Sequence, residues 1–134
     1  MKRMLLCLLL ALSALPPAGL RAQKGRQQQQ KDTCFDTAHT QLELNECADK
    51  DYKTADAALN RVYNQLAAKL SNEEKAKLKE VELNWLKYRD ANCTFEADAY
   101  AGGSIAPFTY SNCLARMTRT RTDELREQLK DREN

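Results

Sequence analysis

The fold is decided by residues 40–71, which read TQLELNECADKDYKTADAALNRVYNQLAAKLS. The stretch opens with a capping box, because Thr40 precedes Glu43 by three residues and the two side chains can cap the first turn of a helix. Apolar residues then recur at spacings of three and four, which is the period of an amphipathic helix. These residues are Leu44, Ala48, Tyr52, Ala55, Leu59, Val62, Leu66 and Leu70. The stretch therefore predicts one long helix with one buried face.

A second helix is predicted directly after the first. Ser71 and Glu74 form another capping box, so the link between the two helices is very short and forces an antiparallel hairpin. The second helix carries an apolar stripe at helical spacing, which predicts the face that it buries. The stripe consists of Leu78, Val81, Trp85, Tyr88 and Phe95.

A third helix is predicted after a break in the pattern. The sequence AGGS at residues 101–104 ends the second helix, and Pro107 keeps the chain irregular until about Thr109. The third helix has Leu114, Met117, Leu125 and Leu129 on its inner face and Arg116, Arg119 and Arg126 outside. Aromatic residues make up only 7% of the chain, which also favours helices over sheets. We expect an all-α fold, a small three-helix bundle with a long antiparallel helical hairpin and two disulfides.

The chain divides into three parts. Residues 1–22 have the basic start and apolar run of a secretory signal peptide, and residues 23–33 form a flexible polar tether. Residues 34–130 form the helical domain, which leaves no room for a multidomain enzyme.

Without the signal peptide, acidic residues outnumber basic ones by one, which argues against nucleic acid or an anionic membrane as a partner. We expect a periplasmic or secreted protein with no membrane anchor after processing.

Four cysteines follow the signal peptide, namely Cys34, Cys47, Cys93 and Cys113. An even number in a short exported chain favours two disulfides, although four cysteines allow three connectivities. We expect sequential pairing of Cys34 with Cys47 and of Cys93 with Cys113, because each pair joins neighbouring segments. A metal site is disfavoured, since the chain has no Cys-x-x-Cys and only one histidine.

The residues offer little catalytic chemistry. His39 is the only histidine and stands before the first helix, with no nucleophile and orienting group at a recognisable spacing. We expect the carboxylates of the second helix on its solvent face, namely Glu73, Glu74, Glu80 and Glu82. Phosphate-loop and dinucleotide-binding motifs are absent from the sequence. We therefore predict no enzymatic activity and no cofactor.

Trp85, Tyr88, Arg89 and Asp90 form the densest cluster of large side chains. The first three share one helix face because they are three and four residues apart. An aromatic stripe of this kind is usually part of a core, with the arginine tied to a carboxylate or carbonyl of another helix. We therefore interpret the cluster as structural. The alternative is an exposed aromatic anchor for a protein partner.

The break between the second and third helices is a candidate partner-binding segment. Its residues are Gly102, Gly103, Ser104, Thr109 and Tyr110. Two successive glycines permit backbone conformations closed to other residues, and the three hydroxyl groups are hydrogen-bonding partners. We interpret the segment as a pre-ordered, projecting loop. The alternative is a simple turn between two helices.

Motifs in both halves of the domain resemble one known family. The first half contains Thr40-Gln41-x-Glu43-x-Asn45-x-Cys47-Ala48, followed by Tyr52, Ala55-Asp56, Leu59-Asn60 and Tyr63. The second half contains Trp85-x-x-Tyr88-Arg89-Asp90-x-x-Cys93, then Gly102-Gly103-Ser104, Cys113, Arg121 and Leu125. In this order they resemble the N-terminal domain of LprI-like lysozyme inhibitors, over about residues 34–129.

The resemblance implies a small, disulfide-bonded envelope protein of bacteria with lysozyme inhibition as its activity. We expect the chain to bind a lysozyme or related muramidase and to block its cleft, with Ser104 offering hydrogen bonds to the catalytic carboxyl groups. Acidic residues of the first helix would steer a basic enzyme to this surface, namely Glu43, Glu46, Asp49, Asp51 and Asp56. The alternatives are a non-inhibitory periplasmic adaptor or structural protein, and an immunity protein against a wall-degrading toxin.

Overall fold

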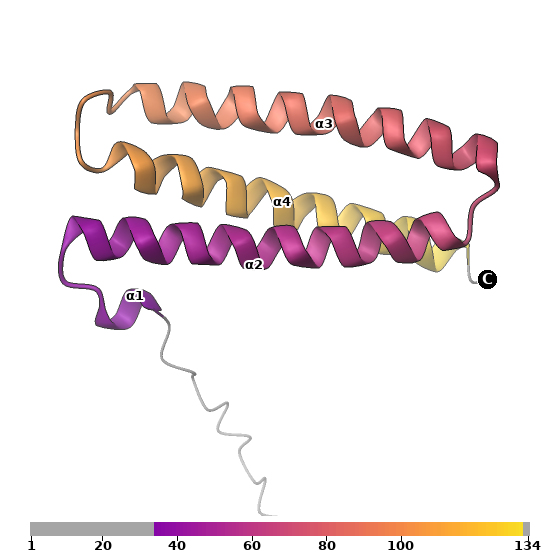
Figure 1. Cartoon of the computed structure of the whole chain (residues 1–134), viewed down its shortest axis with the longest axis horizontal. Coiled ribbons are helices and arrows are strands. Elements are labelled where there is room, and N and C mark those ends of the chain that lie inside the picture. Colours follow the sequence, from indigo (N-terminus) through magenta and orange to yellow (C-terminus); the bar gives the residue numbers. More distant parts are fainter. Residues whose placement is uncertain (1–33, 133–134) are drawn as a thin grey trace, which may run out of the picture. The chain divides into compact units, whose positions relative to one another are not determined.

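The computed structural model describes residues 34–132, which form four helices and no strand (Figure 1). The helices are α1 (Cys34–Thr37), α2 (Gln41–Ala68), α3 (Asn72–Asp98) and α4 (Ala106–Asp131). The expected all-α bundle with a long helical hairpin is confirmed, and α1 adds a single turn that is too short for periodicity to predict. The predicted signal peptide (residues 1–22) and tether (residues 23–33) lie outside the described residues. No helix within the described range is long and apolar enough to cross a membrane.

Both predicted capping boxes are present. Thr40 Oγ1 accepts a hydrogen bond from the backbone N–H of Glu43 at 3.2 Å, and Glu43 Oε2 accepts one from the N–H of Thr40 at 2.9 Å. Ser71 and Glu74 repeat this exchange at 3.3 and 2.9 Å. Only residues 69–71 separate α2 from α3, so the two helices run antiparallel, as Figure 1 shows.

α4 runs back beside both other long helices and approaches α2 most closely. Small side chains are buried on both of these helices: Ala48 and Ala55 on α2, and Ala115 and Thr118 on α4. Small side chains let helix axes approach to the short end of the usual range of about 8–10 Å. The pair α2 and α4 is therefore the tightest contact of the bundle.

The buried apolar side chains form two clusters. The first lies toward the α2–α3 turn and consists of Leu59, Val62, Leu66, Leu78 and Leu125. The second lies toward the α3–α4 loop and consists of Cys93, Cys113 and Leu114, with Tyr52, Tyr110 and Met117 packed against it. The predicted inner faces of the first and third long helices, α2 and α4, are thus confirmed.

The predicted inner face of α3 is partly wrong. Val81, Tyr88 and Phe95 are exposed, so Tyr88 is not a core residue, whereas Glu82 is buried instead of lying on the solvent face. Arg89 is buried as well, on the same face as Glu82. Both sets of residues follow helical spacing. Glu82 and Arg89 can face the other helices because α2 and α4 supply hydrogen-bonding and ionic partners for their charges. Counting apolar residues alone cannot separate the two faces.

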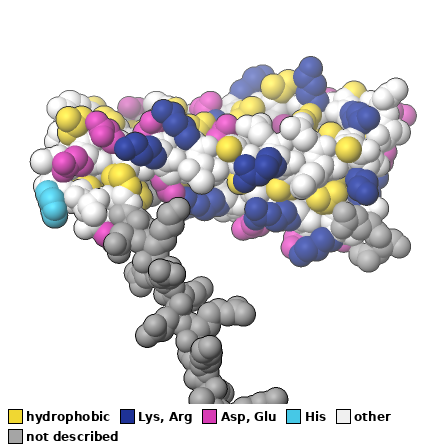
Figure 2. Space-filling view, turned by 60° about the horizontal axis from the view of Figure 1, so that its bottom comes forward, with side chains coloured by type: hydrophobic (Ala, Val, Ile, Leu, Met, Phe, Trp, Pro, Cys, Tyr) yellow, Lys and Arg dark blue, Asp and Glu magenta, His cyan; other side chains and the backbone are white. Residues whose placement is uncertain are grey.

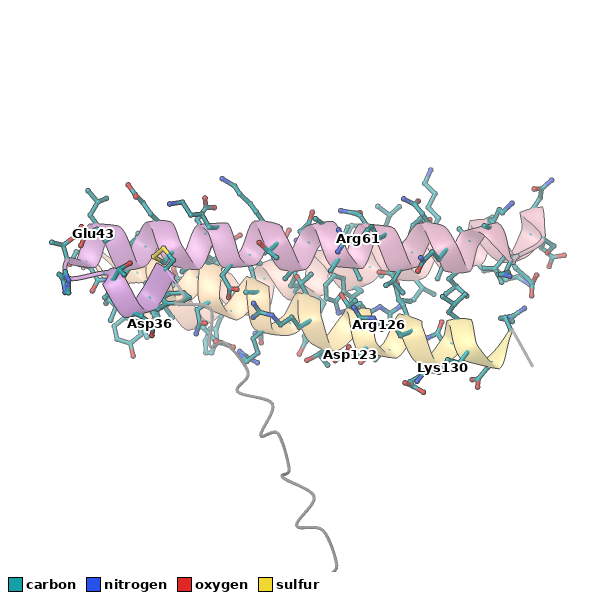
Figure 3. The ribbon with its side chains drawn as sticks, turned by 90° about the horizontal axis from the view of Figure 1, so that it is seen from below. Asp36, Glu43, Arg61, Asp123, Arg126 and Lys130 are labelled. Atoms are coloured by element: carbon teal, nitrogen blue, oxygen red, sulfur yellow. A yellow bond between two sulfur atoms is a disulfide. The ribbon has the colours of Figure 1, made fainter. Side chains whose placement is uncertain are left out.

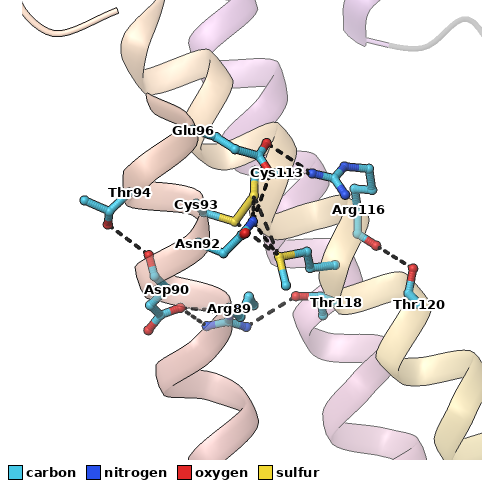
Figure 4. The surroundings of a disulfide bond; sticks show 11 residues. Arg89, Asp90, Asn92, Cys93, Thr94, Glu96, Cys113, Arg116, Thr118 and Thr120 are labelled. Atoms are coloured by element: carbon cyan, nitrogen blue, oxygen red, sulfur yellow. Dashed lines mark hydrogen bonds and ion pairs between the residues drawn. A yellow bond between two sulfur atoms is a disulfide. The ribbon is translucent and has the colours of Figure 1, made fainter. Parts of the chain in front are cut away.

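Both predicted disulfides are confirmed. Cys34–Cys47 ties α1 to the start of α2 (Figure 3), and Cys93–Cys113 ties the end of α3 to the start of α4 (Figure 4). Cys93 and Cys113 are completely buried, whereas Cys34 is exposed. The second disulfide is therefore part of the core next to the α3–α4 loop.

Candidate functional site

Residues 99–105 form the loop between α3 and α4 and turn the chain twice in succession. The N–H of Gly103 donates to the carbonyl of Tyr100 at 2.9 Å, and the N–H of Ala106 donates to the carbonyl of Gly103 at 3.2 Å. Gly102 has a φ of +78°, a left-handed conformation that side chains disfavour. At Gly103, a Cβ would lie 3.1 Å from the Tyr100 carbonyl oxygen. Glycine is therefore favoured at residue 102 by the backbone angle, and at residue 103 by the close approach of the Tyr100 carbonyl.

The start of α2 supports this loop. Asn45 Nδ2 donates to the carbonyl of Ser104 at 3.0 Å, and Gln41 Nε2 donates to Asn45 Oδ1 at 2.9 Å, which orients the Asn45 amide. Nearby, Phe35 of α1 meets Phe108 of α4 edge to face, with ring centroids 6.3 Å apart. The loop is thus held by α2 as well as by the helices that it connects. No local sequence signal indicates this role of Asn45, because its contact joins residues 59 positions apart.

Ser104 is exposed, and its hydroxyl has no hydrogen-bond partner within residues 34–132. Over the same range, the backbone N–H groups of Gly102, Ser104 and Ile105 donate to no carbonyl. The loop therefore presents one hydroxyl and three amide donors that are free to bind another molecule.

Thr109 and Tyr110 do not belong to the loop, contrary to expectation. α4 begins at Ala106, and Pro107 lies in its first turn, where the fixed φ and missing N–H of proline suit a helix start. Thr109 donates its hydroxyl to the carbonyl of Ile105 at 3.3 Å, and the ring of Tyr110 packs against the buried disulfide. Only the Gly-Gly-Ser part of the predicted binding set lies in the loop.

Three large apolar side chains are exposed around the loop. Leu42 lies in the first turn of α2, and Tyr100 and Ile105 belong to the loop itself. The hydrogen bond between Asn45 and Ser104 brings the start of α2 and the loop to the same end of the bundle. Exposed apolar groups beside free donors are typical of a binding surface.

The loop end of the bundle, defined as residues 34–49 and 96–112, contains no lysine or arginine. Its six acidic residues are Asp36, Glu43, Glu46, Asp49, Glu96 and Asp98. Figure 2 shows Asp and Glu side chains near the single histidine and a mixture of both signs over the rest of this face, and Figure 3 shows Glu43 and Lys130 toward opposite ends. Hydrogen bonds from the His39 N–H and from Thr40 hold the pKa of Glu43 below its usual value, so this carboxylate is ionised at neutral pH.

Arg89 is buried beside the second disulfide (Figure 4). Its guanidinium carbon lies 5.4 Å from the ring centroid of Tyr52 on α2 and 5.2 Å from that of Trp85. Arg89 also donates to Asp90 Oδ1 at 2.9 Å and to Thr118 Oγ1 of α4 at 3.3 Å. These contacts give Arg89 a packing role that involves all three long helices.

A second buried charge lies between α3 and α4. Arg121 donates from Nε to Glu82 Oε1 at 2.9 Å and from Nη1 to Glu124 Oε2 at 2.7 Å. Burial lowers the pKa of Arg121, but the two carboxylates raise it more, so it lies above its ordinary value. Sequence reasoning missed the buried role of Glu82. The signal for this role is its place between Leu78 and Trp85, at spacings of four and three on the same face.

The described residues contain no cluster of metal-ligand side chains. Within residues 34–132, no three His, Cys, Asp or Glu side chains are grouped so as to hold a metal ion. His39 is exposed, and its backbone N–H donates to Glu43 Oε2 at 2.8 Å. The candidate site is therefore the loop end, which combines free donors, apolar side chains and negative charge on a braced loop.

The family model described as lysozyme inhibitor LprI matches residues 34–125. The chain belongs to the LprI family. Both disulfides and the α3–α4 loop of this LprI-family protein lie inside the matched region. The chain is also similar to an uncharacterized protein of Rhizobium meliloti (strain 1021), with 37% identity over 110 residues that cover 72% of this chain and 79% of the relative. No solved structure matches the chain.

Proposed function

We propose that this LprI-family protein binds a lysozyme-type muramidase and inhibits it by inserting the α3–α4 loop into the cleft of the enzyme. The observation that carries the proposal is the match of residues 34–125 to a family described as lysozyme inhibitors. The bracing of the loop by α2 and by the second disulfide supports it, since a pre-organised loop loses little conformational freedom on binding. On this proposal the protein is a binding protein and not an enzyme.

The loop presents groups that suit a glycosidase cleft. Such a cleft holds two carboxyl groups, one of them protonated and the other ionised. The hydroxyl of Ser104 and the free N–H groups of Gly102 and Ile105 are donors for the ionised carboxylate. Gly103 has no side chain to hold the backbone away from the floor of the cleft.

The negative charge of the loop end also supports a basic enzyme as partner. Six acidic residues and no lysine or arginine occupy residues 34–49 and 96–112. Opposite charges on two proteins raise their association rate and orient them before contact. A basic muramidase would therefore meet this protein at the end that carries the loop.

The proposal places the mature protein outside the cytoplasm, where a muramidase meets the cell wall. Residues 1–22 would direct export and then be removed. The two disulfides support this location, because disulfides form and persist in oxidising compartments. We propose a periplasmic or secreted protein that binds neither nucleic acid nor a membrane.

The proposal is tested by incubating the exported, purified protein with lysozymes of several structural types. The rate of peptidoglycan hydrolysis and the dissociation constant are measured for each enzyme. We expect inhibition of at least one type, in competition with an oligosaccharide substrate. Capture of another periplasmic protein without inhibition of any muramidase would favour the adaptor alternative, and capture of a delivered wall-degrading toxin would favour the immunity alternative.

A further inference from the structure

One exposed face of α3 consists of uncharged side chains. We name it the α3 stripe, and its residues are Val81, Asn84, Tyr88, Ala91 and Phe95. Each of these residues follows the previous one by three or four positions, so their side chains lie in one row along the helix. Val81 is 52% exposed, Tyr88 62% and Phe95 78%. The row is therefore open to solvent along its whole length.

The composition of the α3 stripe differs from that of the remaining surface. Charged residues make up 30% of the chain, yet none of the five stripe residues is charged. Single exposed apolar residues are common on soluble proteins, whereas several exposed apolar residues on one face indicate an interaction surface. Exposed aromatic residues are typical of the centre of a protein–protein interface.

The α3 stripe leads to the α3–α4 loop. A helix rises about 1.5 Å per residue, so the stripe extends roughly 21 Å from Val81 to Phe95. Phe95 lies in the last turn of α3, which ends at Asp98, and the loop begins at the next residue. The stripe and the loop therefore adjoin at the same end of the molecule.

The loop alone is too small to form a stable complex. A specific protein–protein interface buries about 800 Å² on each partner and uses roughly 20–30 residues of each. The loop has only seven residues, 99–105, so neighbouring surface must supply the rest. The α3 stripe is a nearby surface with the composition that such an interface needs.

We propose that the α3 stripe is the second part of the partner-binding surface and packs against the wall of the muramidase cleft that the loop enters. This inference rests on the proposed function and assigns separate roles: Tyr88 and Phe95 anchor the partner, and the loop blocks its cleft. Charge supports this occupant, because the acidic loop end attracts a basic protein. A second copy of this chain, paired in parallel along the stripe, would bring two acidic ends together.

The test compares alanine variants of the exported protein. Tyr88→Ala and Phe95→Ala remove the anchors. Leu83→Ala is the matched control, because Leu83 is also 49% exposed on α3 but lies on a different face, in a groove shared with Asp56 and Tyr63 of α2. We expect the Kd for the inhibited muramidase to rise roughly tenfold or more for each anchor variant and about twofold or less for Leu83→Ala. The melting temperatures of the anchor variants should match that of the wild type.

The outcomes separate this inference from the proposed function. If Ser104→Ala weakens binding but neither anchor variant does, the stripe is outside the interface and the proposed function stands. If the wild-type protein binds no muramidase, the proposed function and the inference about the α3 stripe are both wrong. If light scattering shows a dimer that Phe95→Ala dissociates while inhibition is unchanged, a second copy covers the stripe and the inference is overturned.

Discussion

At the scale of single residues, two charged side chains of α3, Glu82 and Arg89, are buried together with their partners. Arg89 meets Asp90 of its own helix and Thr118 of α4, and Glu82 meets Arg121 of α4. Removing one partner of a buried ion pair leaves the other charge without compensation in a poorly solvated place. These positions should therefore tolerate substitution far less than the exposed aromatic residues of α3.

Glu82→Ala should destabilise the fold by about 3 kcal/mol, the lower end of the range for breaking a buried ion pair, because Glu124 still bonds to Arg121. Urea unfolding followed by circular dichroism measures this change. Glu73→Ala is the control, since Glu73 pairs with Lys77 on the surface and its loss should cost less than about 1 kcal/mol. An equal loss of unfolding free energy in Glu82→Ala and Glu73→Ala would contradict a buried role for Glu82.

Glu74 makes the stability of the α3 cap dependent on pH. Hydrogen bonds from Arg132 and Ser71 lower the pKa of Glu74 from 4.5 to about 2. Because the pKa is lower in the folded protein, the ionised cap stabilises the fold above about pH 4.5 and this contribution is lost as the pH falls toward 2. The melting temperature should drop across this window, by less in Glu74→Gln, which has no carboxylate to protonate. Because the pair of Glu74 and Arg132 is exposed and screened by salt, the difference in melting temperature between the two proteins should be small. Identical curves of melting temperature against pH for the wild type and Glu74→Gln would refute the prediction.

At the scale of elements, the α3–α4 loop separates the groups that hold its shape from the groups that face solvent. Gly102 and Gly103 permit the backbone path, and Asn45 binds the carbonyl of Ser104. The hydroxyl of Ser104 remains free within residues 34–132. Stability and partner binding should therefore respond to different substitutions in one short segment.

Ser104→Ala should weaken muramidase binding by roughly 0.5–1.5 kcal/mol, the usual contribution of one neutral hydrogen bond. Its melting temperature should stay unchanged, because the hydroxyl bonds to no group of the described chain. Calorimetric titration and thermal melting measure the two effects. Thr109→Ala is the control, since that hydroxyl already donates to the carbonyl of Ile105. Full affinity of the Ser104 variant would remove this hydroxyl from the site.

Gly103→Val should reduce inhibition by more than about tenfold, which corresponds to about 1.4 kcal/mol of binding free energy. The added Cβ would lie 3.1 Å from the carbonyl oxygen of Tyr100, so the loop must shift. The long helices should remain folded, as circular dichroism would show. A folded variant with full inhibition would exclude the loop and leave the acidic start of α2 as the candidate surface.

At the scale of the whole molecule, the loop end of the bundle differs in charge from the remaining surface. The loop end has acidic residues and no lysine or arginine, whereas the remaining surface mixes Lys and Arg with Asp and Glu (Figure 2). The net charge of +2 for the full sequence does not describe this arrangement. A charged partner should therefore be oriented during approach as well as attracted.

The association rate constant for a basic muramidase should fall as ionic strength rises, because the Debye length shortens from about 30 Å at 0.01 M to about 8 Å at 0.15 M. We expect a decrease of roughly tenfold, with little change in the dissociation rate. Glu46→Gln at the loop end should reduce the association rate, and Glu127→Gln near the opposite end should not. Stopped-flow measurements that show no salt dependence would argue against electrostatic steering.

Local sequence patterns predicted the three long helices, the starts of α2 and α3 and the favoured disulfide pairing. These features depend on neighbours in the chain: a capping box spans three residues, the turn after α2 is very short, and each disulfide joins adjacent segments. The Gly-Gly-Ser loop was also recognised locally. Its end was not, because Pro107 is compatible both with an irregular segment and with the first turn of α4.

The buried face of α3 and the support of the loop depend on contacts between segments that are far apart in the sequence. Two rows of residues on α3 have the same helical spacing, and they differ only in the partners that other helices bring. Arg89 reaches Thr118 across 29 positions, Glu82 reaches Arg121 across 39, and Asn45 reaches Ser104 across 59. Such contacts leave no local pattern, since a buried charge is tolerated only when a distant segment supplies its partner.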